Sequence, residues 1–535
     1  MSSLPIPGSV VLVDLDGHAG GPHSAAHNDI ILHPTPSRDV NDPLNWSKWR
    51  KQLHFAMLMT YCVSVGFCGC ALNSVLVPIS EQNGIKLGDL VAGTGYMFLL
   101  LGWGGLITQP FALTYGKRLT YMISNVLNVA MVIWLIYINN SGTWFANRLI
   151  MGLISAPIEM LVEVSIADIF YAHERGFYMG VYSMALFGGN FLAPVWAGFA
   201  NDRWGYKWVF WICAIQMGLA SIIMFFFMEE TNYNRGTTEI TEHDVVATPD
   251  SEQEAGGSDK KSEAVVSHNV VGLHTERQLV GTPHTYLQRL SLWHGMFNSV
   301  STMWAQAYRP ILFLRYPVVF WSGFLYGSSL IWYNVLNATA SLIFTDVYNF
   351  KASAVGLTYL GPTIGACLAT VWGGWAADKW LVREARRKNG LREPEDRLWL
   401  LVLNAIVLPV GLILWGVGAA KQIHWIGLVI GGSMVAFTSA NGCTIALNYV
   451  LDSYKDLGGE VILSVILVRN TMSFGIGYAI TPWLNMGYQN TFITAALVGM
   501  AVYASFLPVV YYGKRWRTAS AKSYWQYVKT SVVSH

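Results

Sequence analysis

Stretches without a charged residue recur along almost the whole chain, and their length constrains the fold more than any other feature. About 20 apolar residues in a helix span the hydrocarbon core of a bilayer. Inside lipid, a helix satisfies all of its own backbone polar groups. We therefore predict an all-α integral membrane protein with twelve transmembrane helices, at 54–79, 90–112, 119–139, 144–168, 177–200, 207–228, 317–343, 354–377, 398–419, 424–450, 460–483 and 490–512.

A polar insert separates the first six apolar runs from the last six. We expect one six-helix bundle at 48–228 and a second at 314–513, because the second and eighth runs both end in a glycine-rich segment and a basic turn, as tandem repeats do. Within the insert, residues 286–307 fit either an amphipathic helix on the membrane surface or a partly ordered linker. The polar segments are predicted to be a disordered tail at 1–47, a linker at 229–313 and a second tail at 514–535.

Lys and Arg gather in the loops on one side of the predicted membrane. One of these loops, residues 379–397, carries seven of them, whereas all the loops on the other side carry five. Basic loops tend to stay in the cytoplasm. The linker and both termini are therefore predicted to be cytoplasmic.

Composition argues against several other classes of protein. Of the 535 residues, 53% are hydrophobic and only 12% are charged, against about 25% charged in soluble domains. The six cysteines lie in apolar runs without metal-ligand spacing and no histidine lies deep in a run, so we expect no metal and no cofactor. The net charge of +2 predicts no nucleic-acid partner. We also expect that the chain is not an enzyme, because neither an embedded histidine box nor a nucleophile paired with a base can be identified.

The run at 144–168 carries charge where lipid disfavours it. Glu159 and Glu163 lie one helical turn apart, and Arg148 lies close to the same face. Each embedded charge costs roughly 2.5–3.5 kcal/mol on insertion scales, so this face is predicted to line a polar cavity and to handle protons or cations. The alternative is a structural ion pair with Arg148 or with Arg469, the other embedded cation, for which pairing is the simpler role.

The seventh run carries a stripe suited to an organic solute. Tyr326, Tyr333 and Asn337 share one helical face, with Trp332 and Asn334 beside it. Aromatic rings and amides bind organic molecules, particularly cations. A stripe packed in the core explains the pattern equally well.

The fifth run combines small residues with a proline. Gly189 and Gly198 allow another helix to approach closely, and Pro194 is expected to kink the helix between them. Such a helix is able to rock against a neighbour. Asn190 adds a polar group that is expected to reach the cavity.

Three short motifs link the chain to a family. They are DPLNW at Asp42–Trp46, Ala-Pro-x-Glu ending at Glu159, and HERG at His173–Gly176. With them the chain resembles a major facilitator superfamily transporter of the fungal twelve-span drug:proton antiporter branch, in a subgroup that contains polyamine and organic-cation carriers and toxin efflux pumps. The resemblance implies two pseudo-symmetric six-helix bundles.

The resemblance also assigns roles to individual residues. Arg148-x-x-x-Gly152 matches the fourth-span motif whose arginine is implicated in proton transfer, and residues 189–198 resemble the antiporter motif with alanines in place of two glycines. The loop after the second span keeps Gly116 and Arg118 of the gating signature.

That loop also departs from the signature, because Leu113 and Thr114 stand where the family carries Asp and Arg. In the second half the acid is retained as Asp378. The resemblance therefore implies a gating role for Asp378, alone among the acids of the two loops.

These features favour a proton-coupled carrier that moves a small organic molecule by alternating access. We expect a monomer in the plasma membrane, with the bilayer, protons and solute as its partners, that exports a toxin, drug or secondary metabolite. Glu159 and Glu163 would then exchange protons for substrate. The alternative is proton-driven uptake of polyamines or other organic cations, which the two acids and the aromatic seventh run favour. A nutrient sensor that signals through the polar insert is a third interpretation, from a different class.

Overall fold

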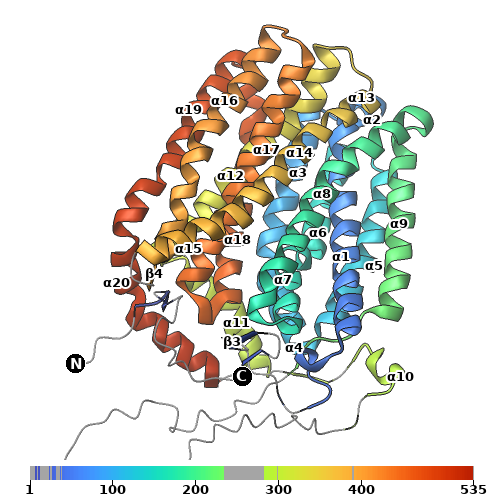
Figure 1. Ribbon diagram of the computed structural model, residues 1–535. Coiled ribbons are helices and arrows are strands. Elements are labelled where there is room, and N and C mark those ends of the chain that lie inside the picture. The colour runs from blue at the N-terminus through green and yellow to red at the C-terminus, as the bar shows by residue number, and fades with distance from the viewer. Residues whose placement is uncertain are drawn as a thin grey trace, which may run out of the picture.

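The computed structural model describes residues 6–8, 10–11, 23–24, 27–31, 37, 39–233, 282, 284–293, 295–297, 299–387 and 391–533. Within these residues the chain forms a tall bundle of helices (Figure 1). Four strands of two to five residues lie at one end of the bundle and pair as β1–β4 and β2–β3. Their bounds are β1 (Val10–Val11), β2 (His23–Ser24), β3 (His27–Ile31) and β4 (Leu391–Arg392).

The first group of helices precedes the polar insert and packs around one hydrophobic core. It follows a short 3-10 turn, η1 (Pro43–Asn45), in which the side chain of Asp42 accepts a hydrogen bond from the backbone of Leu44. The members are α1 (Lys48–Cys70), η2 (Ala71–Ser74), α2 (Leu76–Asn83), α3 (Leu87–Trp103), α4 (Gly105–Tyr115), α5 (Lys117–Ile136), α6 (Ser141–Ser155), α7 (Pro157–Ile169), α8 (Ala172–Trp204) and α9 (Tyr206–Phe227).

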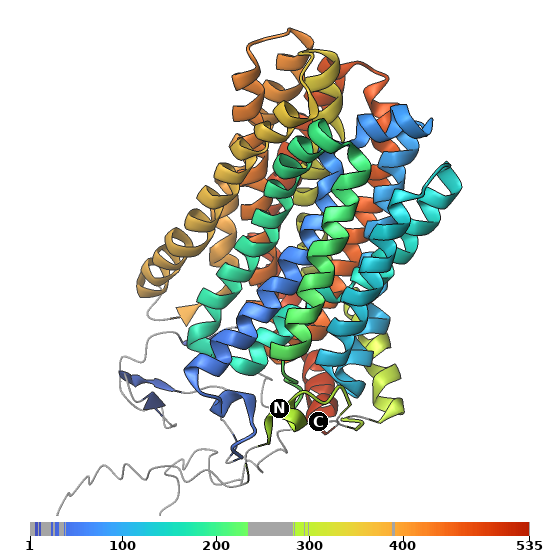
Figure 2. The ribbon, with the colours of Figure 1, turned by 90° about the vertical axis from the view of Figure 1, so that its right-hand side faces the viewer.

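The second group follows the insert and has a hydrophobic core of its own, made almost entirely from its own residues. Its helices are α12 (Pro317–Asp346), α13 (Ala352–Thr358), α14 (Leu360–Val371), the π-helical turn η4 (Trp372–Ala376), α15 (Ala377–Arg387), η5 (Pro394–Leu400), α16 (Leu401–Ala420), α17 (Trp425–Ser453), η6 (Lys455–Leu457), α18 (Gly458–Leu484), α19 (Tyr488–Ala504) and α20 (Phe506–Val533). The two groups stand side by side in Figure 1, and Figure 2 shows the first group in front of the second.

Length and hydropathy identify the membrane-spanning segments. Among the described residues, nine helical segments are long and apolar enough to cross a bilayer, and α3 with α4, bent by 40° between them, makes a tenth. Helices α8 and α12 have 33 and 30 residues but are more polar. With these two, the segments match the twelve predicted runs, and the prediction of an all-α membrane protein is confirmed.

Several predicted boundaries differ from the structure. The run at 144–168 is two helices, because Pro157 starts a new one, so Arg148 and the two glutamates do not share a straight helix. The segment 286–307, which fitted either an amphipathic helix or a partly ordered linker, contains α10 (Tyr286–Arg289) and the first part of α11 (Val300–Phe313), which packs against α4 and α18. The final helix continues to Val533 instead of ending near 512.

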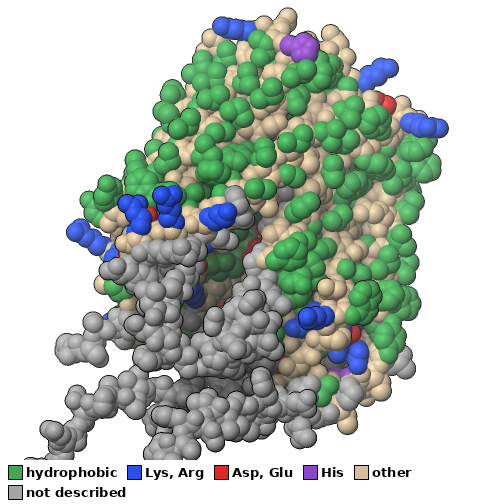
Figure 3. Space-filling model, viewed as in Figure 1, with side chains coloured by type: hydrophobic (Ala, Val, Ile, Leu, Met, Phe, Trp, Pro, Cys, Tyr) green, Lys and Arg blue, Asp and Glu red, His purple; other side chains and the backbone are tan. Residues whose placement is uncertain are grey.

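Both the start of α1 and the end of α20 lie at the end of the bundle that is predicted to be cytoplasmic, which we call the inner end. Toward the opposite, outer end, α8 packs against α13. On another side of the bundle, α3 packs against α18, where the backbones meet at glycines: a Cβ on Gly477 would lie 3.1 Å from the Cα of Gly95. At the inner end the surface between the two groups is hollowed (Figure 3).

Candidate functional site

A cavity of ≈160 Å³ lies between the two groups of helices. The first group contributes lining from α1, α3 and α6 to α8, and the second group from α12 and α18. In another protein an apolar cavity of about 150 Å³ holds benzene. In this conformation the cavity therefore has room for one small organic molecule.

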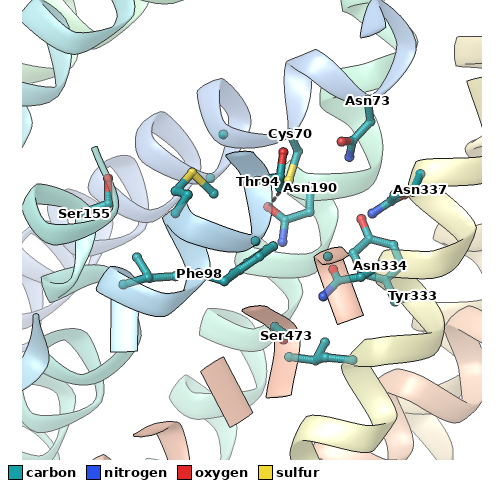
Figure 4. A pocket seen from close by; sticks show the side chains of 18 of the residues that line it. Cys70, Asn73, Thr94, Phe98, Ser155, Asn190, Tyr333, Asn334, Asn337 and Ser473 are labelled. Carbon is teal, nitrogen blue, oxygen red and sulfur yellow. Dashed lines mark hydrogen bonds between the residues drawn. The ribbon is translucent and has the colours of Figure 1, made fainter. Parts of the chain in front are cut away.

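Amide side chains dominate the polar lining of this cavity. Figure 4 shows Asn190 on α8 close to Cys70, whose Sγ donates to its Oδ1 at 3.3 Å. Across the cavity, the Oδ1 of Asn337 and the hydroxyl of Tyr333 are buried without a hydrogen-bond partner among the described residues. Buried polar atoms without partners are rare, and these two leave hydrogen-bonding capacity at the cavity that a ligand or water would satisfy. The asparagines of the lining are Asn73, Asn190, Asn334 and Asn337.

The stripe predicted on α12 is brought to the cavity except at one position. Tyr326, Tyr333, Asn334 and Asn337 line the cavity. Trp332 does not, and its assignment to a binding wall is wrong: the ring is 3% exposed and packs in the second core, 3.3 Å from a Cβ built on Gly499 of α19. A helix turns about 100° per residue, so neighbours in sequence point to different surroundings.

An ion pair between Glu159 of α7 and Arg469 of α18 joins the two groups at the cavity wall. Arg469 Nη2 donates to Glu159 Oε1, and Asn470 Nδ2 donates to Oε2 at 2.9 Å. Arg469 Nη1 also donates to the hydroxyl of Tyr326 at 3.0 Å. The glutamate is 9% exposed and the arginine 4%, so each charge depends on the other. Glu159 is therefore both paired and part of the cavity wall, and its predicted role in handling protons stays a prediction.

Glu163 lies one turn closer to the inner end of α7 and has different surroundings. Its side chain is half-buried, and it makes no hydrogen bond or ion pair with another described residue. It is not among the residues that line the cavity. The sequence predicts the same role for the two glutamates, but in the structure they differ because only Glu159 has hydrogen-bond partners among the described residues.

Arg148 pairs with neither glutamate, so the alternative in which it holds them is wrong. Its guanidinium is fully buried, lies 4.4 Å from the ring of Trp144, and has Nη1 at 3.5 Å from the sulfur atoms of Met97 and Met151. Its Nε and Nη2 have no hydrogen-bond partner among the described residues. The residue borders the cavity only through these methionines, which line it.

The small residues of α8 contact two different helices. A Cβ on Gly356 of α13 would lie 2.6 Å from the carbonyl oxygen of Pro194, and one on Gly198 would overlap the backbone of Ala352. Gly189 instead faces α1, where Val63 Cα would be 3.9 Å from an added Cβ. The proline and the second glycine thus form the close contact between the groups, and Gly189 packs within the first group.

A carboxylate from the polar insert caps α5. Gly116 has φ +122°, and after it the backbone N–H groups of Lys117 and Arg118 donate to Glu230 Oε1 and Oε2 at 3.1 and 3.0 Å. An acid at a helix N-terminus satisfies free N–H groups and interacts favourably with the helix dipole.

The Arg118 side chain anchors the insert to the first group. It is 1% exposed and donates to the carbonyl oxygens of Phe225 at 2.8 Å, Arg289 at 3.2 Å and Ser291 at 3.0 Å. The side chain of Asp378, the other acid singled out for gating, lies outside the described residues, as do those of the HERG motif.

Sequence reasoning missed several polar residues of the site. Asn470 supports the ion pair, and the cavity is also lined by Asn73, Thr94, Ser155 and Ser473. Asn73 lay inside a predicted apolar run, but it carries no charge, so the search for embedded charges passed over it; a search for embedded amides would have found it. Threonine and serine bond to their own helix so often that their presence in a run carries little signal.

Comparisons with known proteins agree with this architecture. The chain is 26% identical to an uncharacterized MFS-type transporter of Schizosaccharomyces pombe, covering 98% of this chain and 94% of the relative. It is 28% identical to Protein HOL1 of Saccharomyces cerevisiae, covering 93% and 92%.

Solved structures share the fold. The proton:xylose symporter XylE matches with a TM-score of 0.58 at 12% identity over 87% of this chain and 97% of XylE. The human organic anion transporter MFSD10 matches with 0.54 at 14% identity over 85% and 99%. The family model of the Major Facilitator Superfamily matches residues 53–470. The chain is therefore a transporter of small solutes and not an enzyme, and it belongs to the major facilitator superfamily.

Proposed function

We propose that this chain is a proton-coupled transporter in which the ion pair between Glu159 and Arg469 couples proton binding to alternating access. The observation that carries the proposal is that this buried pair joins α7 of the first group to α18 of the second at the wall of the cavity. Alternating access requires the two groups to move relative to each other around such a site.

Protonation of Glu159 would weaken this connection. Two unit charges about 4 Å apart attract by roughly 4 kcal/mol at an effective dielectric constant of 20, and neutralising one removes that attraction. Arg469 would keep its hydrogen bonds to Tyr326 and Asn470 within its own group. Proton binding therefore weakens the connection between the groups without leaving the guanidinium unpartnered. We assign to Glu163, closer to the inner end, the transfer of protons between Glu159 and the inner side.

The amide-lined part of the cavity is the proposed substrate site. Asn334, Asn337 and Tyr333 on α12 face Asn190 on α8, so a solute there contacts both groups. Amides accept and donate hydrogen bonds, and tyrosine rings attract cations. We infer a small organic solute with at least one polar group, which a positively charged solute would satisfy best.

Export is the direction we propose, because the close contact of Pro194 and Gly198 with α13 falls in the segment that resembles the antiporter motif. Uptake of polyamines or other organic cations is the second candidate. It is favoured by Glu163, an acid near the cavity without a described partner. We further propose a monomer in the plasma membrane, with two six-helix domains and cytoplasmic termini.

Transport in oriented vesicles tests the proposal. Right-side-out and inverted membrane vesicles containing the chain would be given a pH gradient and a labelled polyamine or neutral drug. Export predicts accumulation in inverted vesicles that are acidic inside, and collapse of accumulation when the gradient is dissipated. Transport unaffected by the gradient in both orientations would refute proton coupling.

A further inference from the structure

Helix α15 continues α14 on the inner side of the second group. The π-helical turn η4 joins the two, and Figure 2 shows the long helix leaving the bundle obliquely. One face of α15 packs inward through Ala377 and Leu381, which are 0% and 4% exposed and lie one turn apart. Helix α15 also contacts β4 and η5, and its exposed side chains among the described ones are Lys379, Trp380, Arg383 and Arg387.

The opposite face of α15 is basic. Lys379, Arg383 and Arg387 follow each other at intervals of four residues, and all three are exposed. Figure 3 shows Lys and Arg side chains gathered over this helix. Glu384 contacts Arg387 at 3.4 Å, but the arginine side chain remains 72% exposed, so the pair neutralises little. Between 378 and 392 the sequence has six basic residues against two acidic ones.

Exposed tryptophans locate this face relative to the bilayer. Trp372, Trp380 and Trp399 are 36%, 40% and 43% exposed, and they lie on η4, α15 and the adjoining η5. Indole rings concentrate at the level of the lipid headgroups. The basic face of α15 therefore lies where the hydrocarbon core ends and the headgroups of the inner leaflet begin.

We propose that Lys379, Arg383 and Arg387 of α15 form a binding surface for anionic lipid headgroups of the inner leaflet. A cation near an anionic membrane surface strengthens association about fivefold, and arginine matches the geometry of a phosphate. This proposal rests on the position of α15 at the membrane, and it does not depend on the proposed proton coupling.

Lipid binding to the purified full chain tests this surface. In uncharged detergent, native mass spectrometry counts bound dioctanoyl-phosphatidylserine and dioctanoyl-phosphatidylcholine. We expect the wild type to bind phosphatidylserine more tightly than phosphatidylcholine. The triple variant Lys379→Gln/Arg383→Gln/Arg387→Gln should bind phosphatidylserine on the order of 100-fold more weakly, with its binding of phosphatidylcholine unchanged. A matched variant removes three exposed cations scattered over the same end, Lys48→Gln/Arg315→Gln/Arg515→Gln, and should keep the preference.

Four results would overturn the proposal. The first is equal binding of the two lipids by the wild type, and the second is an equal loss in both triple variants. The third concerns the insert, whose residues 234–281 carry nine acidic and four basic side chains. If a preference for phosphatidylserine arises only after these residues are deleted, the insert, and not lipid, occupies the basic face in the full chain. Inorganic phosphate that competes as well as the lipid would equally assign the surface to a soluble anion.

Discussion

Replacing Glu159 by glutamine removes the charge that joins the two groups of helices and leaves the size of the side chain unchanged. Removing one partner of a buried ion pair costs about 3–5 kcal/mol. Here the amide still offers one acceptor, and Arg469 keeps Tyr326 and Asn470. We therefore expect a loss near the lower bound, about 3 kcal/mol of stability, together with loss of proton-coupled flux.

The assay separates these two effects. Proteoliposomes containing Glu159→Gln would be loaded with a pH-sensitive dye, and proton movement driven by added substrate would be followed next to thermal unfolding of the same preparation. Glu163→Gln is the matched control, because it makes the same chemical change one turn away where no described partner is lost. It should unfold like the wild type and retain slower proton movement.

Restoring charge balance gives a further check on the reasoning. Glu159→Gln/Arg469→Gln removes both charges, so no charge is left buried alone. We expect the double variant to be more stable than the sum of the single losses by about 1–3 kcal/mol, the coupling typical of residues in contact. Additive losses, or proton movement by Glu159→Gln equal to that of the wild type, would refute the assigned role.

Three other substitutions test other parts of the site. Asn337→Ala should raise the substrate concentration for half-maximal transport about fivefold with little change in thermal unfolding, because its Oδ1 has no partner to lose. Asn404→Ala is the control: the Asn404 amide is hydrogen-bonded to Thr438, so this variant should lower the temperature of unfolding instead. Gly356→Val should keep α8 and α13 apart, which stops transport and exposes the cavity to impermeant thiol reagents added outside. Arg118→Ala should speed proteolysis between 286 and 297, whereas Arg118→Lys should do so less.

The transmembrane segments could be predicted from sequence because apolar length is a local property. Where the end of the last helix was wrong, the decisive contact was not local: α20 continues past the predicted end, and Arg517 within it forms a buried pair with Glu395. Hydropathy does not report contacts between residues more than 100 positions apart.

Several residues of the site could be predicted from the sequence, but the contacts between them could not. Embedded charge pointed to Glu159, and the face of α12 pointed to Tyr333 and Asn337, which line the cavity. The partner of Glu159 is Arg469, 310 residues later on another helix. Embedded charge identified Arg148 and Arg469 as the two candidates, and only the structure shows which of them reaches the carboxylate. Trp332 was misassigned because residues beside a stripe turn toward a different neighbour.

The two glutamates differ in the group of helices that supplies their partners. Glu159 lies in the first turn of α7 and Glu163 in the second. Arg469 and Asn470 of the second group both donate to Glu159, whereas no described residue bonds to Glu163. A carboxylate whose partners all belong to the other group of helices loses them when the groups separate, which is what coupling requires.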